Sequence, residues 1–247
     1  MKEIIEEYWN WRSATYHTEL KAYEDEEQLI WKNILTSALP HERTMNVLDV
    51  GTGPGYMALA FAEMGHSVIA VDISREMLKK AKQKAYDQGA TIDFYHGDAE
   101  KLPFMDGQFD LIVSKYLLWT LPSPDAFLHE CQRLLSPEGI ILAIDGTWFK
   151  PSISNSIRKV VAGCANSINN IHNPGIFEQY YSGVKHKLPL YHENAPEDVS
   201  SLLVNSGFDG VSYQYLLEYR DFQKRSGKLN YYINNPKTPY MIIGKKR

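Results

Sequence analysis

The sequence has little of several features that define whole classes of protein. Only two of its 247 residues are cysteine, Cys131 and Cys164, and Cys131 lies in a stretch with helical periodicity, so neither a disulfide framework nor a metal–thiolate cluster is expected. No apolar run reaches the length of a membrane span, and the opening MKEIIEEYW carries acids where a signal peptide has basic and then apolar residues. These absences predict a protein of the reducing cytoplasm that is neither exported nor inserted into a membrane.

An excess of positive charge is also lacking. The 30 acidic residues outnumber the 26 basic ones, which gives a formal net charge of -4. Nucleic acid is therefore not the expected partner. There is no internal repeat, low-complexity tract or glycine-serine linker, and the 44% of hydrophobic residues is typical of a globular protein. We expect residues 1–247 to form a single domain.

The sequence does contain a regular alternation of strand and helix patterns from Met45 onward. Strands are expected at 46–50, 67–71, 91–95, 109–114 and 139–144, with helices at 56–64, 75–88 and 123–136. A helix at 196–206 is followed by strands at 210–216 and 240–244, which could pair as a hairpin. This order predicts a Rossmann-like α/β fold: a doubly wound, mostly parallel seven-stranded sheet with helices on both faces.

Two segments lie outside this alternation. Residues 1–43 are predicted to form an N-terminal helical cap, in which the acidic run 24–27 is interpreted as a solvated first turn. Residues 150–195 follow the fifth strand and are too long for an ordinary connection, so we expect them to form a helical lid. The core is then 44–149, and 196–247 supplies a closing helix and strands.

A glycine-rich loop follows the first strand. Residues 46–56 read NVLDVGTGPGY, with glycines at 51, 53 and 55 that permit positive φ and remove the β-carbon, so that backbone can approach a ligand closely. A dinucleotide-binding fingerprint would place its third glycine one position later, where Tyr56 stands. The spacing therefore argues against NAD and FAD.

Two acidic residues flank this loop in the expected fold. Asp49 lies two residues before the first glycine, where it would repel a phosphate but suit a ligand with positively charged groups. Asp72 ends the second strand, and its two oxygens could accept both hydroxyls of a ribose. The pattern favours a nucleoside ligand that carries positive charge.

Two longer segments carry a family resemblance. VLDVGTGPGYMALAFAEMGHSVIAVDIS and GDAEKLPFMDGQFDLIVS resemble class I S-adenosylmethionine-dependent methyltransferases, in particular their UbiE-like, small-molecule branch. The resemblance covers roughly residues 44–146. It implies S-adenosylmethionine as cofactor and S-adenosylhomocysteine as product, with Asp98 and Ala99 at the adenine. The cofactor-binding residues it suggests in this core are Asp49, Gly51, Thr52, Gly53, Gly55, Asp72, Ile73, Met77, Asp98, Ala99 and Ser114, although core packing would explain Ile73 and Met77 nearly as well.

The N-terminal YWNWRSATY, residues 8–16, resembles a segment that many relatives place over the cofactor. The resemblance suggests that Arg12 binds the methionine carboxylate and that Tyr16 covers the reactive end. Alternatively, the aromatic residues of this segment only anchor its helix to the domain.

The sequence identifies no catalytic residue. Methyl transfer from a sulfonium needs an oriented acceptor and an absence of water more than it needs a dedicated base. Residues after the fourth strand (Lys115, Tyr116, Trp119) and after the fifth (Asp145, Thr147, Trp148) are expected to face the acceptor. The catalytic candidates are Tyr16, Trp119, Trp148 and His172, and no metal is expected because ligand spacing is absent.

The predicted lid has a basic balance. The segment contains one acid, Glu178, and five cations: Lys150, Arg158, Lys159, Lys185 and Lys187. We therefore expect a small-molecule acceptor with an anionic group, although a solvated helical face would carry the same charges. Two alternatives stay open: a methyltransferase for RNA or protein that docks on the basic lid, and a non-catalytic binder of S-adenosylmethionine or another nucleoside. Neither the acceptor atom nor the oligomeric state is indicated.

Overall fold

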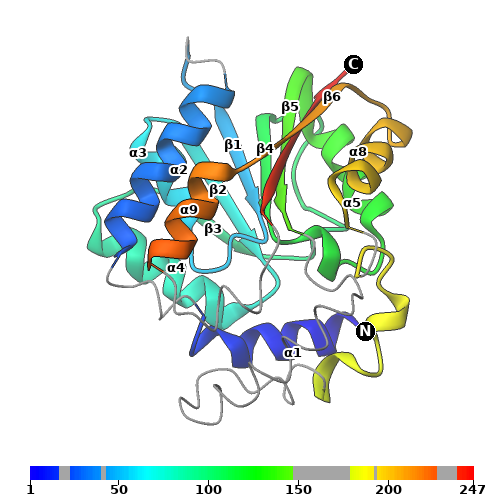
Figure 1. Ribbon diagram of the computed structural model, residues 1–247, viewed down its shortest axis with the longest axis horizontal. Coiled ribbons are helices and arrows are strands. Elements are labelled where there is room, and N and C mark those ends of the chain that lie inside the picture. Colours follow the sequence, from blue (N-terminus) through cyan, green and yellow to red (C-terminus); the bar gives the residue numbers. More distant parts are fainter. Residues whose placement is uncertain (17–22, 40–42, 147–178, 192–193, 227–237) are drawn as a thin grey trace.

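The structure is a computed structural model that describes residues 1–16, 23–39, 43–146, 179–191, 194–226 and 238–247. The described residues form a seven-stranded sheet in the order β3-β2-β1-β4-β5-β7-β6 (Figure 1). The strands are β1 (Asn46–Val50), β2 (Ser67–Asp72), β3 (Asp93–His96), β4 (Phe109–Lys115), β5 (Leu135–Asp145), β6 (Phe208–Tyr215) and β7 (Tyr240–Lys246). Of these strands only β7 runs antiparallel to its neighbours. The prediction of a mostly parallel seven-stranded sheet is confirmed.

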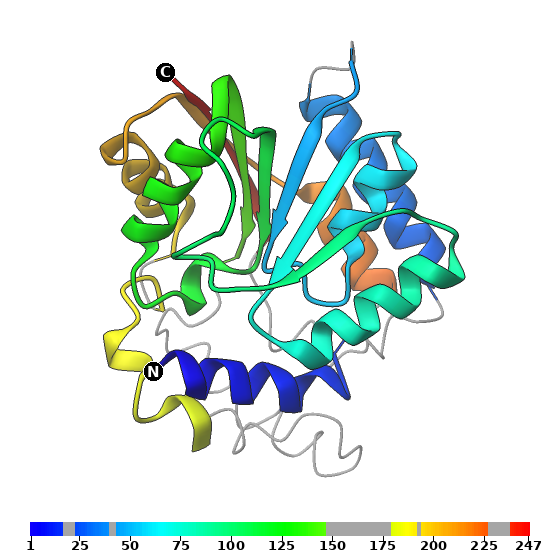
Figure 2. The same cartoon turned by 180° about the vertical axis from the view of Figure 1, so that it is seen from behind.

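Helices cover both faces of this sheet. They are α1 (Lys2–Ser13), α2 (Glu24–Ala38), α3 (Tyr56–Glu63), α4 (Arg75–Asp87), α5 (Pro124–Leu134), α8 (Pro196–Asn205) and α9 (Leu217–Ser226), with short 3-10 turns η2 (Leu118–Thr120) and η3 (Lys185–Lys187). Figures 1 and 2 show α2, α3 and α9 on one face and α5 and α8 on the other.

The strand sequences explain this double layer. Successive side chains of a strand point to opposite faces, so a strand covered on both sides must be apolar throughout. In β1, Val47 packs in the cluster that contains α2, α3 and α9, whereas Leu48 packs in the cluster that contains α5 and α8, and both are fully buried. Each face therefore has its own core.

The end of the chain differs from the prediction in one respect. The last two strands pair antiparallel, but α9 lies between them, so they are not a simple hairpin. Sequence reasoning missed α9 because its apolar residues are few: Tyr219 and Phe222 are buried among charged neighbours. Tyr219 packs against Trp31 of α2, with the two ring centroids 4.4 Å apart.

The two helices of residues 1–43 have different positions. α2 packs against the sheet through Trp31 and Leu35, and its Glu27 is fully buried, so the interpretation of the run 24–27 as solvated is wrong for this residue. α1 instead lies across the end of the sheet where the parallel strands finish (Figures 1 and 2). Most of the predicted lid, 150–195, is outside the described residues, and the lid stays a prediction.

Candidate active site

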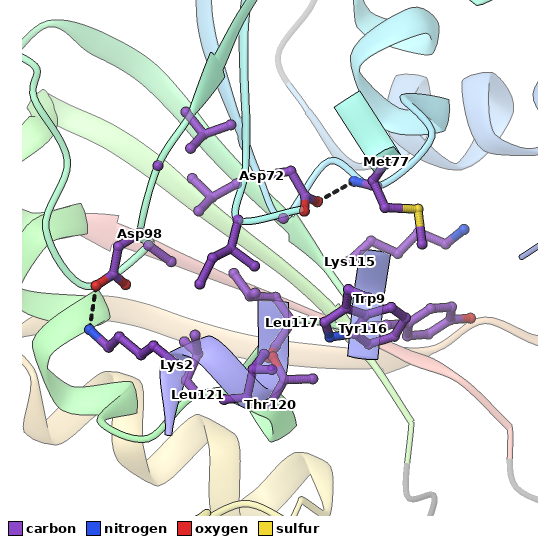
Figure 3. Close-up of a pocket in the computed structure, with 18 of the residues that line it drawn as sticks. Lys2, Trp9, Asp72, Met77, Asp98, Lys115, Tyr116, Leu117, Thr120 and Leu121 are labelled. Carbon is purple, nitrogen blue, oxygen red and sulfur yellow. Dashed lines mark hydrogen bonds and ion pairs between the residues drawn. The ribbon is translucent and has the colours of Figure 1, made fainter. Parts of the chain in front are cut away.

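A cavity of about 750 Å³, its open mouth included, lies at the carboxyl ends of β1, β2 and β4. Open parallel sheets bind their ligands at this edge, where the strand order reverses. α1 forms the opposite wall through Lys2, Ile5 and Trp9. Figure 3 shows Asp72 and Asp98 along one side of the cavity, with Lys115 and Tyr116 on another. The remaining lining residues are Tyr16, Val50, Gly51, Gly53, Val71, Ile73, Met77, Gly97, Ala99, Leu117, Thr120, Leu121 and Pro122.

The glycine loop forms the floor of this cavity. Gly51 and Gly53 have φ values of 71° and 55°, which lie in the left-handed region that residues with a β-carbon rarely adopt. A β-carbon on Gly51 would lie 2.9 Å from Cδ1 of Leu117, so close packing also requires glycine there. A β-carbon on Gly53 would meet no atom within 4 Å, and the loop is therefore open to a ligand at that point.

Asp72 ties the loop to the end of β2. Its Oδ2 accepts a hydrogen bond from Gly53 N at 2.7 Å, and its Oδ1 accepts one from Ser74 N at 2.7 Å. Burial raises the pKa of Asp72 to about 6, against the effect of these two hydrogen bonds. Each carboxylate oxygen has a second lone pair, so both can still accept a hydroxyl from a ligand in the cavity.

Asp49 lines a second, smaller cavity of about 320 Å³ beside the first. Its Oδ2 accepts hydrogen bonds from Thr52 Oγ1 at 2.6 Å and from Ala58 N at 3.0 Å. Its Oδ1 is buried and has no hydrogen-bond partner among the described residues. Burial raises the pKa of Asp49 to about 7, so this carboxyl group is poised to ionise when a cation binds next to it.

The far end of the main cavity combines a carboxylate with apolar side chains. Asp98 accepts a hydrogen bond from Glu100 N at 3.0 Å through Oδ1, and its Oδ2 forms an ion pair with Lys2 of α1. The apolar part is formed by Ile73, Met77 and Ala99. An aromatic base with an exocyclic amine is complementary to this combination. Lys2 was missed, because nothing in the sequence indicates that the first turn of α1 reaches Asp98.

The structure brings most of the predicted site residues together. Asp49 and Thr52 line the smaller cavity, Asp72, Ile73, Met77, Asp98 and Ala99 line the larger, and Tyr16, Gly51 and Gly53 line both. Lys115 and Tyr116, predicted from their position after the fourth strand, also reach the cavity wall. Sequence reasoning missed Leu117 and Thr120, although the same position after β4 could have indicated them.

Five predicted residues do not line either cavity, and one of them is Asp145, which is fully buried at the end of β5. Gly55 begins α3 at a φ of 89° and Ser114 is buried within β4. Arg12 Nη1 donates to Thr15 Oγ1 at 2.5 Å and the guanidinium lies 5.5 Å from the Tyr16 ring centroid. Trp119 packs with Trp9 in an aromatic cluster. Their roles stay predictions, as do those of Trp148 and His172, which lie outside the described residues.

Among the residues that the structure describes, no group of three histidine, cysteine, aspartate or glutamate side chains is arranged to hold a metal ion. No described helix is both long enough and apolar enough to cross a membrane.

Comparisons with known proteins agree with this geometry. Residues 48–143 match the family model described as a methyltransferase domain. The chain is 28% identical over 196 residues to the ubiquinone/menaquinone biosynthesis C-methyltransferase UbiE of Rickettsia typhi, covering 76% of this chain and 77% of that protein. It is 33% identical over 114 residues to an uncharacterised protein of Mycobacterium tuberculosis, covering 46% of this chain and 42% of that protein. The match thus spans less than half the length of that relative.

The fold has solved counterparts. Phosphoethanolamine N-methyltransferase 2 of Haemonchus contortus, in complex with phosphomonomethylethanolamine and S-adenosylhomocysteine, superposes with a TM-score of 0.62 at 17% identity over 96% of this chain and 60% of that chain. At this identity the likeness shows the fold alone. The matched methyltransferase domain, the UbiE similarity and the site at the strand ends together support a methyltransferase domain of the class I S-adenosylmethionine-dependent kind over residues 48–143.

Proposed function

We propose that this methyltransferase binds S-adenosylmethionine in the cavity described above and methylates a small-molecule acceptor that carries an anionic group. The observation that carries the proposal is Asp72, a buried carboxylate at the end of β2 that holds the glycine loop, lines the cavity and keeps a free lone pair on each oxygen. This arrangement suits the two hydroxyls of an unphosphorylated ribose.

The remaining residues fit the cofactor from end to end. Asp98, Ala99 and Ile73 suit the adenine, because the carboxylate can accept from the exocyclic amine while the apolar groups pack against the ring. At the other end, the unpaired Oδ1 of Asp49 can accept from the α-ammonium group. Gly53, with open space where a side chain would be, leaves room for the chain between these ends.

The bound cofactor supplies a methyl group that is already activated on a sulfonium sulfur. The protein's own residues then orient the acceptor and exclude water. α1 contributes Ile5 and Trp9 to the wall opposite the strand ends, and both are apolar. Burial raises the pKa of Tyr16 to about 12, so its hydroxyl stays protonated at neutral pH and can donate a hydrogen bond but not act as a base.

Three observations support a small anionic acceptor. The cavity lies between the strand ends and α1, which is the kind of concave site that small molecules occupy. Lys185 and Lys187 are in the described part of the basic segment that follows the fifth strand. The names of the similar proteins refer to quinone biosynthesis and to phosphoethanolamine, which are small-molecule chemistries, the second anionic.

The cofactor assignment is tested by calorimetric titration of the purified protein with S-adenosylmethionine, S-adenosylhomocysteine and NAD. We expect micromolar binding of the first two and none of NAD, and a loss of about tenfold or more, roughly 1.4 kcal/mol, for Asp72→Ala. Asp93→Ala, which removes an exposed acid from the neighbouring strand, is the matched control and should bind like the wild type. No binding by the folded wild type would refute the assignment.

The acceptor class is tested with S-adenosylmethionine labelled in its methyl group and a cell extract. The label should appear in the acid-soluble, low-molecular-weight fraction and be retained on an anion exchanger. Label in acid-precipitable material that is sensitive to ribonuclease or protease would support the RNA or protein alternative. Cofactor binding without transfer to any fraction would support the non-catalytic alternative.

A further inference from the structure

Lys115, at the end of β4, is an ammonium group buried at the junction of the two cavities. Its side chain is 9% exposed and lines the larger cavity (Figure 3). It also lines the smaller cavity that contains Asp49. Lysine is rarely buried to this degree without a partner, because removing an ammonium group from water costs several kcal/mol.

The surroundings of Lys115 satisfy its charge only in part. Its Nζ lies 3.9 Å from Glu27 Oε1, which is too far for a hydrogen bond, and that oxygen already accepts from Tyr219 Oη at 2.7 Å. The ring centroids of Trp31, Tyr56, Tyr116 and Tyr219 lie between 4.8 and 5.9 Å from Nζ. Nζ has three N–H groups, and none donates to a described residue.

The carboxylate of Asp49 presents the opposite charge to the same small cavity. Its Oδ2 is fully used by Thr52 and Ala58, whereas Oδ1 is buried and unpaired among the described residues. One cavity of about 320 Å³ therefore has a buried cation and a buried anion in its wall, each with unused hydrogen-bonding capacity. An α-amino acid in its zwitterionic form is the complementary ligand.

The backbone next to Lys115 is in an uncommon conformation. Tyr116 has a φ of 61°, and its N donates to Ile144 O at 2.8 Å, which fixes the chain where it leaves β4. Left-handed conformations of residues other than glycine store strain and are concentrated at functional sites. The following Leu117 packs against Gly51, so the end of β4 is also held against the glycine loop.

We propose that Lys115 binds the α-carboxylate of the cofactor's amino-acid end, while Asp49 accepts from its α-ammonium group. This inference rests on the proposed function. It reassigns a role that the sequence suggested for Arg12, whose Nη1 is bonded to Thr15 and which lines neither cavity. Lys115 and Asp49 come from adjacent strands of the sheet, so their separation is set by the core rather than by a surface helix.

The test uses two ligands that share the adenosine and differ at the amino-acid end. S-adenosylhomocysteine has the α-amino acid, and 5′-methylthioadenosine lacks it. We expect Lys115→Met to weaken S-adenosylhomocysteine binding at least tenfold and to leave 5′-methylthioadenosine binding within twofold of the wild type, as measured by calorimetry. Lys79→Met, at an exposed lysine of α4, should bind both ligands like the wild type.

The possible results separate this inference from the proposed function. If Lys115→Met binds S-adenosylhomocysteine as tightly as the wild type does, or loses affinity equally for both ligands, the role of Lys115 is overturned and the cofactor assignment stands. A wild type that binds neither ligand overturns the cofactor assignment and the inference with it.

Lys115→Met removes a cation 3.9 Å from the buried Glu27, so this variant is expected to lose some stability. The double variant Glu27→Gln/Lys115→Met removes both charges and provides a second test with the same expected ligand pattern. A third measurement needs no variant. S-adenosyl-3-thiopropylamine keeps the amine but lacks the carboxylate, and it should bind the wild type at least tenfold more weakly than S-adenosylhomocysteine. Equal affinities would contradict the proposal.

Discussion

Two acidic side chains at the strand ends are more deeply buried than charged side chains usually are. Asp49 is 1% exposed and Asp72 is 7% exposed. Each is held by hydrogen bonds from the protein, but these do not use all of its lone pairs. Because the effective dielectric constant around buried groups is low, a charge on a bound ligand interacts with them more strongly than it would in water. The pKa values of these carboxyl groups are therefore sensitive to what binds.

Replacement of Gly51 by alanine should abolish tight cofactor binding. The residue has a φ of 71°, which alanine adopts only with strain, and its new β-carbon would lie 2.9 Å from Leu117 Cδ1, so the loop or the Leu117 side chain that lines the cavity must shift. Gly65→Ala is the matched control, because its φ is 86° but its β-carbon would meet open space. Both variants should lose about 1–2 kcal/mol of stability from backbone strain.

Calorimetry and urea unfolding separate the two effects. Only Gly51→Ala should weaken S-adenosylhomocysteine binding, by at least about tenfold. If Gly65→Ala lost binding to the same extent, general destabilisation and not the loop geometry would be the cause.

Affinity for S-adenosylhomocysteine should fall as the pH is lowered below 7. Burial raises the pKa of Asp49 to about 7 in the free protein, and an ammonium group beside it favours the ionised form. Ligand binding therefore releases a proton, and below this pKa the loss of affinity approaches tenfold per pH unit. The pKa of Asp72 is raised to about 6, so its protonation adds a second decrease of ligand affinity at lower pH.

Calorimetry between pH 5.5 and 8, in two buffers of different ionisation enthalpy, measures both the affinity and the proton released. Asp49→Asn should bind more weakly at pH 8 and lose the dependence between pH 6 and 7. A pH-independent affinity of the wild type would contradict the position that we assign to the ammonium group.

At the scale of elements, α1 packs Ile5 and Tyr8 in the cluster beside α5 and is also joined to the rest of the molecule by polar contacts. Asn10 Oδ1 accepts from Ser74 Oγ at 2.8 Å and from Glu76 N at 3.2 Å, at the N-terminus of α4. Lys80 of α4 donates to Ser13 O, and Lys2 pairs with Asp98. Each contact joins α1 to the segments that follow β2 and β3. The helix that closes the cavity is thus positioned by the elements that form its other walls.

Asn10→Ala should destabilise the protein by about 1–3 kcal/mol, because it removes the acceptor of a buried hydroxyl and of a helix N-terminal amide. Asn33→Ala, at an exposed position of α2, is the control and should change stability by less than about 0.5 kcal/mol. Urea unfolding measures both. Equal stabilities of the two variants would mean that Asn10 does not hold α1 to α4.

At the scale of the whole molecule, the site joins parts that belong to both cores. Trp9 and Val50 belong to the cluster beside α5, whereas Tyr116 packs against the cluster beside α2 and α3. All of these residues line the same cavity. A ligand that fills the cavity contacts both layers at once, and its binding free energy adds to the stability of the entire fold.

S-adenosylhomocysteine at 100 times its Kd should raise the free energy of unfolding by about 2.7 kcal/mol. For a chain of this size the increase corresponds to a rise in Tm of roughly 5–10 °C. Thermal unfolding followed by fluorescence measures the shift, and NAD at the same concentration should produce none. A shift from NAD as large as that from S-adenosylhomocysteine would contradict the specificity that the glycine spacing predicts.

The sequence by itself determined the sheet and the cofactor end of the site. Strand and helix periods are local, so the parallel sheet and the position of Asp72 at a strand end could be predicted from neighbouring residues. The loop spacing likewise places Gly51 and Gly53 beside Asp49. In these cases the chemistry lies within a few residues of a strand whose direction is already fixed.

Only the tertiary structure decided which distant residues meet there. Glu27 is an ordinary helix acid in the sequence, and its burial near Lys115 depends on how α2 packs against the end of β4. Lys2 reaches Asp98 only because α1 crosses the strand ends, 96 residues away in the chain. α9 was missed for the same reason, since its few apolar residues are buried by contacts that its own sequence does not encode. Periodicity reports which face of an element is apolar, whereas partners are chosen by packing across the whole molecule.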